Sequence, residues 1–417
     1  MTENILYAQS GGVTSVINAT ACGVIKTARS SDKFNKVFAA KNGILGALNE
    51  EIIDTTRESS RVIDGLMHTP GGAFGSCRYK LQSVDDDIRE YVRLVDVFKA
   101  HKIKYFLYNG GGDSQDTANK VGQLSSQLGY SISCIGIPKT IDNDLPITDS
   151  SPGFGSVAKY VATSTLEASL DVRSMAGSST KVFLFEVMGR NAGWIAASSG
   201  LIKSQSMSAP HVILFPEIQF DENKFLKKVR EAVIKYGYCV VVASEGIRRK
   251  DGSFISNAGS VDAFGHSQLG GVSPFLADLV KRSLALKCHW AVADYLQRSA
   301  RHLASSNDVK QAFALGEAAV RFAENGQNMV MPVIRRIAGK RYRWKIASTK
   351  LSRVANIERK LPRSYITKDG FGITKKAKEY LFPLIQGEEY PPYAGGLPSY
   401  TYPKNELVTK KLPAFSK

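Results

Sequence analysis

"KYFLYNGGGDSQDT", residues 104–117, joins an apolar run to a helical pattern through three consecutive glycines. The apolar run predicts a buried strand. The same order recurs at residues 4–28, where "NILYAQ" precedes "SGG" and a helical stretch, and at residues 131–146, where "SISCIGIP" ends in "KTIDNDLP". Strands that alternate with helices in this way predict a doubly wound parallel sheet, with ligands at the carboxyl ends of the strands.

A second set of apolar runs predicts a second α/β lobe. These runs are "KVFLFEVMG" (181–189), "HVILFPE" (211–217) and "YCVVVASEG" (238–246), with helical segments between them. We therefore expect two α/β lobes with a cleft between them. From about residue 340 the pattern weakens, and "GEEYPPYAGGLPSYTYPKNE" (387–406) is rich in Pro, Gly and Tyr. We expect that tail to wrap the surface without building a core.

The composition is that of a soluble globular protein. Hydrophobic residues make up 43% and charged residues 22% of the 417 positions. The five cysteines are scattered without CxxC spacing, which favours the reducing cytoplasm. The start "MTENILYAQS" lacks the basic region of a signal peptide, and no apolar run approaches the ~20 residues of a membrane helix. We expect a cytoplasmic protein without a membrane partner.

The net charge of +17 favours polyanionic partners. The strongest argument for nucleic acid is "RRIAGKRYRWKIASTKLSR" (335–353), which combines aromatic residues with many cations. No zinc-finger or RNP signature accompanies it. A small phosphate ligand or a solvated basic face is the better interpretation, so we expect no nucleic-acid partner.

Four glycine loops together predict a site for several phosphates. "SGGVTS" (10–15), which contains Gly12, precedes a helix whose N-terminus suits an anion. "TPGGAFGSCRYK" (69–80) adds the cation Arg78, and "SPGFGS" (151–156) opens another helix. None of the loops matches GxxxxGK[ST] or GxGxxG, which argues against a P-loop NTPase and a Rossmann dehydrogenase.

"PKTIDNDLP" (138–146) carries the residues best suited to catalysis. Asp142 and Asp144 are two positions apart, so in extended backbone both carboxylates face the same way. One can act as a general base toward a hydroxyl while the other holds a metal or orients the base. Lys139 would face the phosphoryl group and stabilise its charge. The alternative is a turn in which Asp and Asn are only caps.

Four motifs resemble those of the phosphofructokinase family. "GGxDS", "PKTIDND", "EVMGRNAGWIA" and "GHSQLGG" occur in the family's order and approximate spacing, over residues 5 to about 330. The resemblance implies the phosphofructokinase fold of two Rossmann-like lobes and a C-terminal extension. The expected division is a larger, donor-side lobe of residues 1–155 and 270–325, a smaller, sugar-side lobe of residues 156–269 and 326–345, and an extension of residues 346–417.

That resemblance implies roles for the matching residues. Asp142 matches the base that deprotonates the sugar 1-hydroxyl, Asp144 supports the substrate and the metal, and Thr140 contacts the transferring phosphate. The residues that match the fructose 6-phosphate pocket are Met188, Gly189, Arg190, Glu245 and His266. The residues expected on the donor are Gly12, Arg78, Gly112, Asp113, Ser114 and Lys139.

Two positions indicate which donor is used. ATP-dependent members read GGDGS and PGTIDND, whereas pyrophosphate-dependent members resemble this chain, with Asp113 and Lys139. An aspartate would repel the α-phosphate region of ATP, and a lysine suits a compact donor without a nucleoside. A register one residue later would instead put Asp113 at the metal position and Ser114 at the discriminating position.

The resemblance is incomplete at the metal and at the sugar phosphate. Gly112 stands where the family has a metal-linked aspartate, so we expect Mg²⁺ on Asp113 or Asp144. Leu269 stands where many relatives have a sugar-phosphate arginine. We expect the 6-phosphate to bind Lys181, at the place of an arginine that ATP enzymes lend across a subunit interface, and tail cations such as Arg353, Arg359 or Lys360.

The implied activity is reversible phosphoryl transfer from pyrophosphate to the 1-hydroxyl of fructose 6-phosphate, in glycolysis and gluconeogenesis. Family pockets completed across subunits imply a homodimer or homotetramer. Cys22 and Lys26 stand at the places of effector-binding arginines, so we expect little nucleotide regulation. Two alternatives stay open. An ATP-dependent sugar kinase of the same family predicts glycine at positions 113 and 139, and a non-catalytic regulatory subunit predicts loss of the two loop aspartates.

Overall fold

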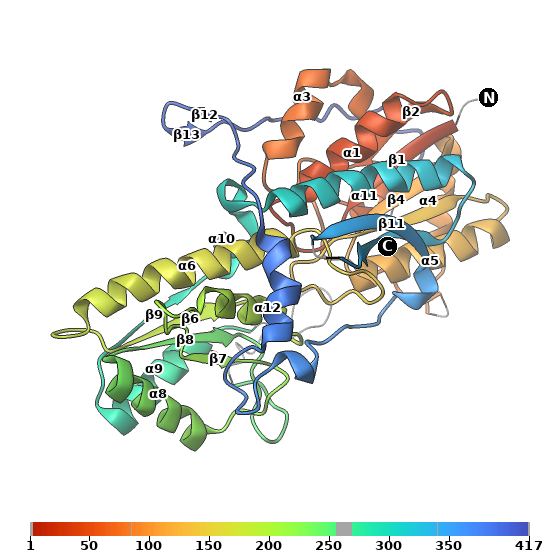
Figure 1. Cartoon of the computed structure of the whole chain (residues 1–417). Helices are drawn as coiled ribbons and strands as arrows, with labels where there is room; N and C mark the ends of the chain where they lie inside the picture. The colour runs from red at the N-terminus through yellow and green to blue at the C-terminus, as the bar shows by residue number, and fades with distance from the viewer. Residues whose placement is uncertain (1–2, 85, 256–268, 340, 416–417) are drawn as a thin grey trace.

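The computed structural model describes residues 3–84, 86–255, 269–339 and 341–415, which form two α/β lobes, each on its own sheet (Figure 1). In these four ranges, no helix is long and apolar enough to cross a membrane. The α/β class and the two-lobe arrangement predicted from the apolar runs are therefore confirmed.

The first lobe is built on a seven-stranded sheet of order β11-β10-β5-β4-β1-β2-β3. Its strands are parallel from β10 to β2, and the edge strands β11 and β3 pair antiparallel with their neighbours. The strands are β1 (Glu3–Gln9), β2 (Phe34–Ala40), β3 (Ile52–Asp54), β4 (Ile103–Gly110), β5 (Ser133–Pro138), β10 (Val330–Ile337) and β11 (Arg343–Lys350).

Side chains of β1 alternate between two cores, as the pleat of a strand requires. Leu6 and Ala8 face one core, and Ile5 and Tyr7 face the other. The first core is covered by α2 (Ile44–Leu48), α4 (Arg89–Ala100) and α5 (Gly112–Gln127), and the second by α1 (Ile17–Arg29), α3 (Ser60–Gly65) and α11 (Ser306–Glu324). Both faces of the sheet are thus buried, which is typical of parallel sheets.

The second lobe is built on a four-stranded parallel sheet of order β7-β8-β6-β9. Its strands are β6 (Val182–Val187), β7 (Val212–Leu214), β8 (Cys239–Ser244) and β9 (Cys288–Val292). One face packs on α6 (Phe154–Met175), α7 (Trp194–Ser198) and α12 (Lys375–Leu381), and the other on α8 (Glu222–Tyr236) and α9 (Val272–Leu284). Trp194 is buried and packs edge-on against Phe154, with ring centroids 6.3 Å apart.

The positions at which the chain crosses between the lobes differ from the expected domain boundaries. We expected residues 270–325 in the larger lobe, but α9 and β9 belong to the second sheet, because Val272, Leu276 and Val280 complete its core. We expected residues 326–345 in the smaller lobe, but β10 and β11 extend the first sheet, where Met331 and Val333 are buried.

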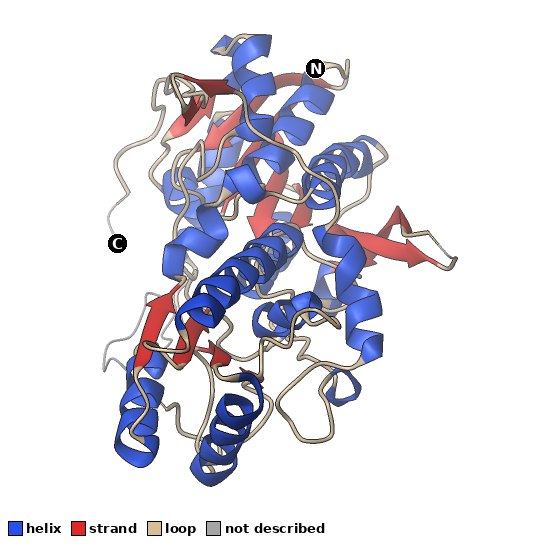
Figure 2. Cartoon of the chain, turned by 60° about the vertical axis from the view of Figure 1, so that its left-hand side comes forward, coloured by secondary structure: helices blue, strands red, loops and turns tan. Residues whose placement is uncertain are grey.

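The cation-rich stretch 335–353 forms most of the hairpin of β10 and β11, which extends outward at the side of the molecule in Figure 2. β10 pairs with β5, which explains why one half of β10 is apolar. The cations of the stretch 335–353 lie mostly at half-buried or exposed positions. The stretch is therefore an edge of the larger sheet.

The tail returns to the first lobe and lies along the edge strand β3. The Asp54 amide donates to the carbonyl of Glu406 (3.0 Å), and the Val408 amide donates to the carbonyl of Ile52 (2.8 Å). The buried Glu50 carboxylate accepts the amide of Lys411 (2.6 Å). Residues 387–406 are nearly all half-buried or exposed, so the prediction of a surface-wrapping tail is confirmed.

Candidate functional site

A cavity of about 840 Å³ lies between the lobes, at the carboxyl ends of β1, β4 and β5. These three strands are parallel neighbours, so the loops that follow them meet at one edge of the sheet, as predicted. The predicted site residues that line the cavity are Gly12, Arg78, Gly112, Asp113, Ser114, Lys139, Thr140, Asp142, Asp144, Met188, Arg190 and Glu245.

Two glycine loops of the first lobe pack on each other beneath the cavity. The Ser76 hydroxyl donates to the Gly11 carbonyl (2.7 Å), and the Gly11 amide donates to the Cys77 carbonyl (2.9 Å). A side chain at Gly12 would meet a guanidinium, because its Cβ would stand 2.7 Å from Nη1 of Arg298. The glycine therefore lets cations approach the backbone closely, which suits an anion site.

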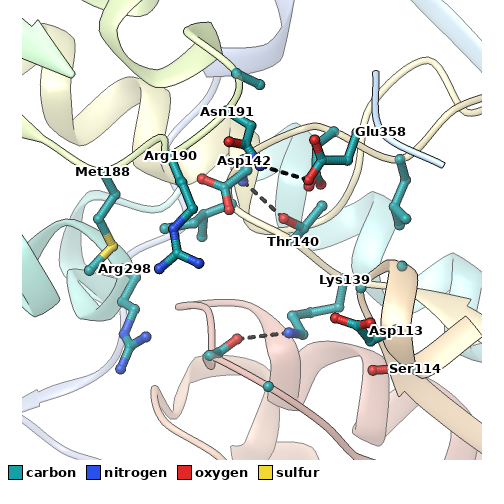
Figure 3. A pocket seen from close by; sticks show the side chains of 18 of the residues that line it. Asp113, Ser114, Lys139, Thr140, Asp142, Met188, Arg190, Asn191, Arg298 and Glu358 are labelled. Carbon is teal, nitrogen blue, oxygen red and sulfur yellow. Dashed lines mark hydrogen bonds between the residues drawn. The ribbon is translucent and has the colours of Figure 1, made fainter. Parts of the chain in front are cut away.

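Lys139 is the buried cation of this site. Its ammonium donates to the Gly12 carbonyl (2.8 Å; Figure 3), and its side chain leaves the loop after β5 toward the first glycine loop. Burial, together with the nearby charges of Arg78 and Arg298, lowers the pKa of Lys139 to about 8. Three cations that repel one another at close range form a site that gains energy when an anion binds.

Asp142 and Asp144 lie on the same loop, on the cavity side. The Asp142 amide donates to the Thr140 hydroxyl (3.0 Å), and Asn143 between the two carboxylates has a left-handed backbone (φ 53°). Burial raises the pKa of Asp142 well above its ordinary value, and the neighbouring Asp144 and Glu245 raise it further. Burial also raises the pKa of Asp144. A carboxylate with a raised pKa is a stronger base, suited to taking a proton from a hydroxyl.

The N-terminus of α5 also lines the cavity. Asp113 lies in its first turn, and its carboxylate is 3.5 Å from the ammonium of Lys80. The Ser114 hydroxyl donates to the Ser10 hydroxyl (2.9 Å) and so joins the helix to the first glycine loop. The amides at this helix end suit a phosphate, while Asp113 limits how much negative charge can bind there.

Residues from the second lobe line the opposite wall. Met188 and Arg190 follow β6 and point into the cavity (Figure 3). Glu245 follows β8 and also lines it. Gly189 does not line the cavity, but its amide donates to the Glu245 carboxylate (3.3 Å), which holds that side chain. Burial raises the pKa of Glu245.

Several expected contacts are not made within this chain. Lys181 precedes β6, whereas the cavity lies at the opposite, carboxyl end of that strand, and its ammonium donates to the Ala176 carbonyl instead. Arg359 donates to the carbonyls of Asn143 and Thr148 (both 2.7 Å), so its guanidinium holds the loop after β5. Arg353 and Lys360 do not line the cavity either. His266 lies outside the described residues.

Several cavity residues had no predicted role, among them Arg298, Asn191 and Glu358. Arg298, in α10 (Asp294–Ser299), lines the cavity and supplies a cation there, and burial lowers its pKa. Asn191 donates to the Glu358 carboxylate (2.9 Å; Figure 3), and both line the cavity. "YLQRS" (295–299) was the available signal for Arg298, whereas Glu358 lies in the extension, where no motif marks it.

Known proteins resemble this chain over nearly its whole length. The chain is 57% identical over 414 residues to "Pyrophosphate--fructose 6-phosphate 1-phosphotransferase" of Halomonas elongata, covering 99% of both chains. It is 58% identical over 413 residues to the protein of the same name from Methylococcus capsulatus, covering 99% of this chain and 98% of the relative.

A crystal structure of a pyrophosphate-dependent phosphofructokinase from Nitrosospira multiformis is similar over 100% of both chains, with a TM-score of 0.93 and 57% sequence identity. The sequence profile of the phosphofructokinase family matches residues 4–323, which contain both sheets except β10 and β11. The chain belongs to the phosphofructokinase family.

Proposed function

We propose that this protein transfers a phosphoryl group from pyrophosphate to the 1-hydroxyl of fructose 6-phosphate, giving fructose 1,6-bisphosphate and phosphate. The observation that carries the proposal is one loop, after β5, that presents both the buried cation Lys139 and the carboxyl of Asp142 to one cavity. The names of the relatives at 57% and 58% identity support the same donor and acceptor.

Transfer needs a base at the acceptor and positive charge at the donor. Asp142 takes the proton of the sugar hydroxyl while the oxygen attacks phosphorus in line with the leaving phosphate. Lys139, Arg78 and Arg298 neutralise the charge of the phosphoryl group and of the leaving phosphate, with the amides of the glycine loops. Met188, Arg190 and Glu245 hold the sugar on the opposite wall. The reaction then runs readily in both directions, in glycolysis and gluconeogenesis.

Mg²⁺ fits the carboxylates that face the cavity. The Oδ1 atom of Asp144 is buried without a hydrogen-bond partner in the described part of the chain, and the Asp113 carboxylate is about one third exposed. Mg²⁺ usually binds one or two carboxylates together with phosphate oxygens and water. We therefore assign Asp144 and Asp113 as its ligands. When bound, the ion neutralises charge on the donor phosphates.

The direct test is a parallel assay with fructose 6-phosphate and Mg²⁺, giving pyrophosphate or ATP as the donor. We expect turnover with pyrophosphate alone. Turnover with ATP alone would favour the ATP-dependent sugar kinase, and silence with both donors would favour the regulatory subunit. Either of these results would reject the proposed function.

We expect a bell-shaped pH dependence of kcat/KM for the sugar phosphate. Asp142 must be ionised to accept a proton, so its raised pKa makes the rate rise with increasing pH. Lys139 must be charged, so the rate falls as the pH passes through its pKa of about 8. Initial rates between pH 6 and 10, with both substrates far below their KM, would check this, with Lys139→Arg as the control that moves the falling limb upward. A flat profile above pH 8 would exclude Lys139 as the cation that titrates.

We also propose a homodimer or homotetramer in the cytoplasm, in which β9 faces a second copy. Among the described residues β9 is an edge strand, and Trp290, Val292 and Leu296 are about half exposed or more (49%, 45% and 65%). An apolar patch of this kind marks an association surface. A two-fold axis across the middle of β9 would bring Lys181 of a second copy toward the sugar side of this cavity.

Trp290→Glu should therefore halve the molar mass measured by light scattering and raise KM for fructose 6-phosphate at least ~10-fold, because the lost partner supplies Lys181. Ile234→Glu, on the exposed face of α8, is the matched control and should change neither quantity. Unchanged mass in the Trp290 variant would place the interface elsewhere.

A further inference from the structure

Four residues of the C-terminal extension, 355–358, cross the opening between the lobes, and we call them the cleft strap. Asn356, Ile357 and Glu358 line the cavity. They lie beyond residues 4–323, to which the family profile extends, so no family motif assigns them a role.

The first lobe holds one end of the strap. Leu351 and Val354 are fully buried in the core under α5, and the Ala355 amide donates to the Leu351 carbonyl (2.9 Å). Leu351 packs directly over β5, since its Cδ2 lies 2.6 Å from where a Cβ at Gly136 would stand. This end cannot move without opening the core.

The loop after β5 and the second lobe hold the other end. The Arg359 amide donates to the Asp144 carbonyl (2.6 Å), and its guanidinium bonds to the carbonyls of Asn143 and Thr148. Its own carbonyl accepts from the indole of Trp194 (3.1 Å). Within the strap, the Glu358 carboxylate accepts from Asn191, as Figure 3 shows. The strap is therefore fixed over the cavity.

The strap faces the end of α5 that suits a phosphate. The amide nitrogen of Asn356 lies 3.8 Å from where a Cβ at Gly112, the first residue of α5, would stand. Near the same helix end, the Lys80 ammonium and the Asp113 carboxylate are 3.5 Å apart. A phosphate at this helix end thus has the strap and this ion pair as neighbours, and a group attached beyond it on that side would meet them.

We propose that the cleft strap is a second determinant of donor size, which admits a diphosphate and excludes donors that continue past the second phosphate. The inference rests on the proposed function and deepens it. The strap excludes longer donors sterically through Asn356 and Ile357, and electrostatically through Glu358, whose charge adds to that of Asp113 at the cavity wall. The expected ligand class is a compact inorganic phosphoanhydride.

The test compares tripolyphosphate with pyrophosphate as donors, at saturating fructose 6-phosphate and fixed free Mg²⁺. The variant is Asn356→Gly with Ile357→Gly, which trims the wall and keeps both anchors. Glycine suits the left-handed backbone at position 356 (φ 56°), and Ile357 is half exposed (47%). We expect the ratio of kcat/KM for tripolyphosphate to that for pyrophosphate to rise at least ~10-fold.

Ser352→Gly, exposed and outside the cavity, is the matched control and should keep the parent ratio. Adding Asp113→Gly to the trimmed strap should also make ATP a competitive inhibitor or donor, more than either change does alone. If the double variant does not fold, Asn356→Gly alone should raise the ratio at least threefold. A folded trimmed variant whose ratio equals that of the parent would overturn the inference.

Failure of the proposed function would appear differently. In that case the unmodified protein itself would not use pyrophosphate, whatever the strap does.

Discussion

Asp142→Asn should lower kcat for phosphoryl transfer by at least ~10²-fold, because the amide cannot take the proton of the sugar hydroxyl. The dissociation constant of fructose 6-phosphate should change little, since Asn keeps the shape of the side chain. Pre-steady-state transfer and equilibrium binding of the sugar would separate the two effects. The rising limb of the pH profile should disappear in the variant, because the group that titrates is gone.

The same variant should be at least as stable as the parent. A buried carboxyl with a raised pKa stabilises the fold only in its neutral form, so its contribution is present at low pH and is lost as the pH rises through the folded pKa. Above that pKa, an uncharged Asn removes the cost of a buried charge. A higher or equal melting temperature at pH 9 would show that lost activity is not misfolding.

Asp149→Asn is the matched control for Asp142→Asn. Asp149 lies on the segment that follows the same loop and pairs with Arg336 outside the cavity (3.1 Å), so kcat should stay within about threefold of the parent. If Asp142→Asn retained the parent kcat, the base would have to be another group, and Glu245 would be the next carboxylate to test.

Lys139→Met should lower kcat/KM for pyrophosphate by about 10²- to 10³-fold, the effect expected when one preorganised donor to the transition state is removed. Methionine has a similar length and is easily buried, so the loop can keep its conformation. Removing the cation should also raise the pKa of Asp142 further, because Lys139 lowers it. The rising limb of the pH profile should then move to higher pH.

Lys120→Met provides the comparison for Lys139→Met. Lys120 pairs with Asp116 on α5 (2.7 Å) away from the cavity, and its loss should leave kcat/KM nearly unchanged. An equal loss of kcat/KM in both variants would mean that the activity depends on the net charge of the protein and not on the position of the ammonium. Full activity of Lys139→Met would contradict the assignment of Lys139 to the donor.

Prediction from the sequence works best where strands are apolar on both faces. β1, β4, β5, β6 and β8 are such strands, and the loops that follow them contain the motifs. β9 escapes prediction because most of its side chains are exposed, so its sequence "CHWAV" carries no burial pattern. β10 also escapes prediction, because cations follow its apolar half and interrupt the hydrophobic pattern.

The position of a residue along a strand explains why Lys181 was expected at the site while Arg298 was not. A six-residue strand separates its two ends by nearly 20 Å, so Lys181 before β6 and Met188 after it lie at opposite edges of the sheet. Arg298 reaches the cavity only because the chain passes from β9 into α10. The position of Glu358 at the cavity depends on the cleft strap. The contacts that hold the strap there involve residues far away in the sequence.

The tail that lies along β3 also affects how the protein is made. β3 and Glu50 leave the ribosome long before residues 405–412, which cover that sheet edge. Until then the edge strand has unpaired backbone groups of the kind that recruit strands from other chains. Nascent or truncated chains that lack the tail should therefore need chaperones, even though every residue that lines the cavity has already been made.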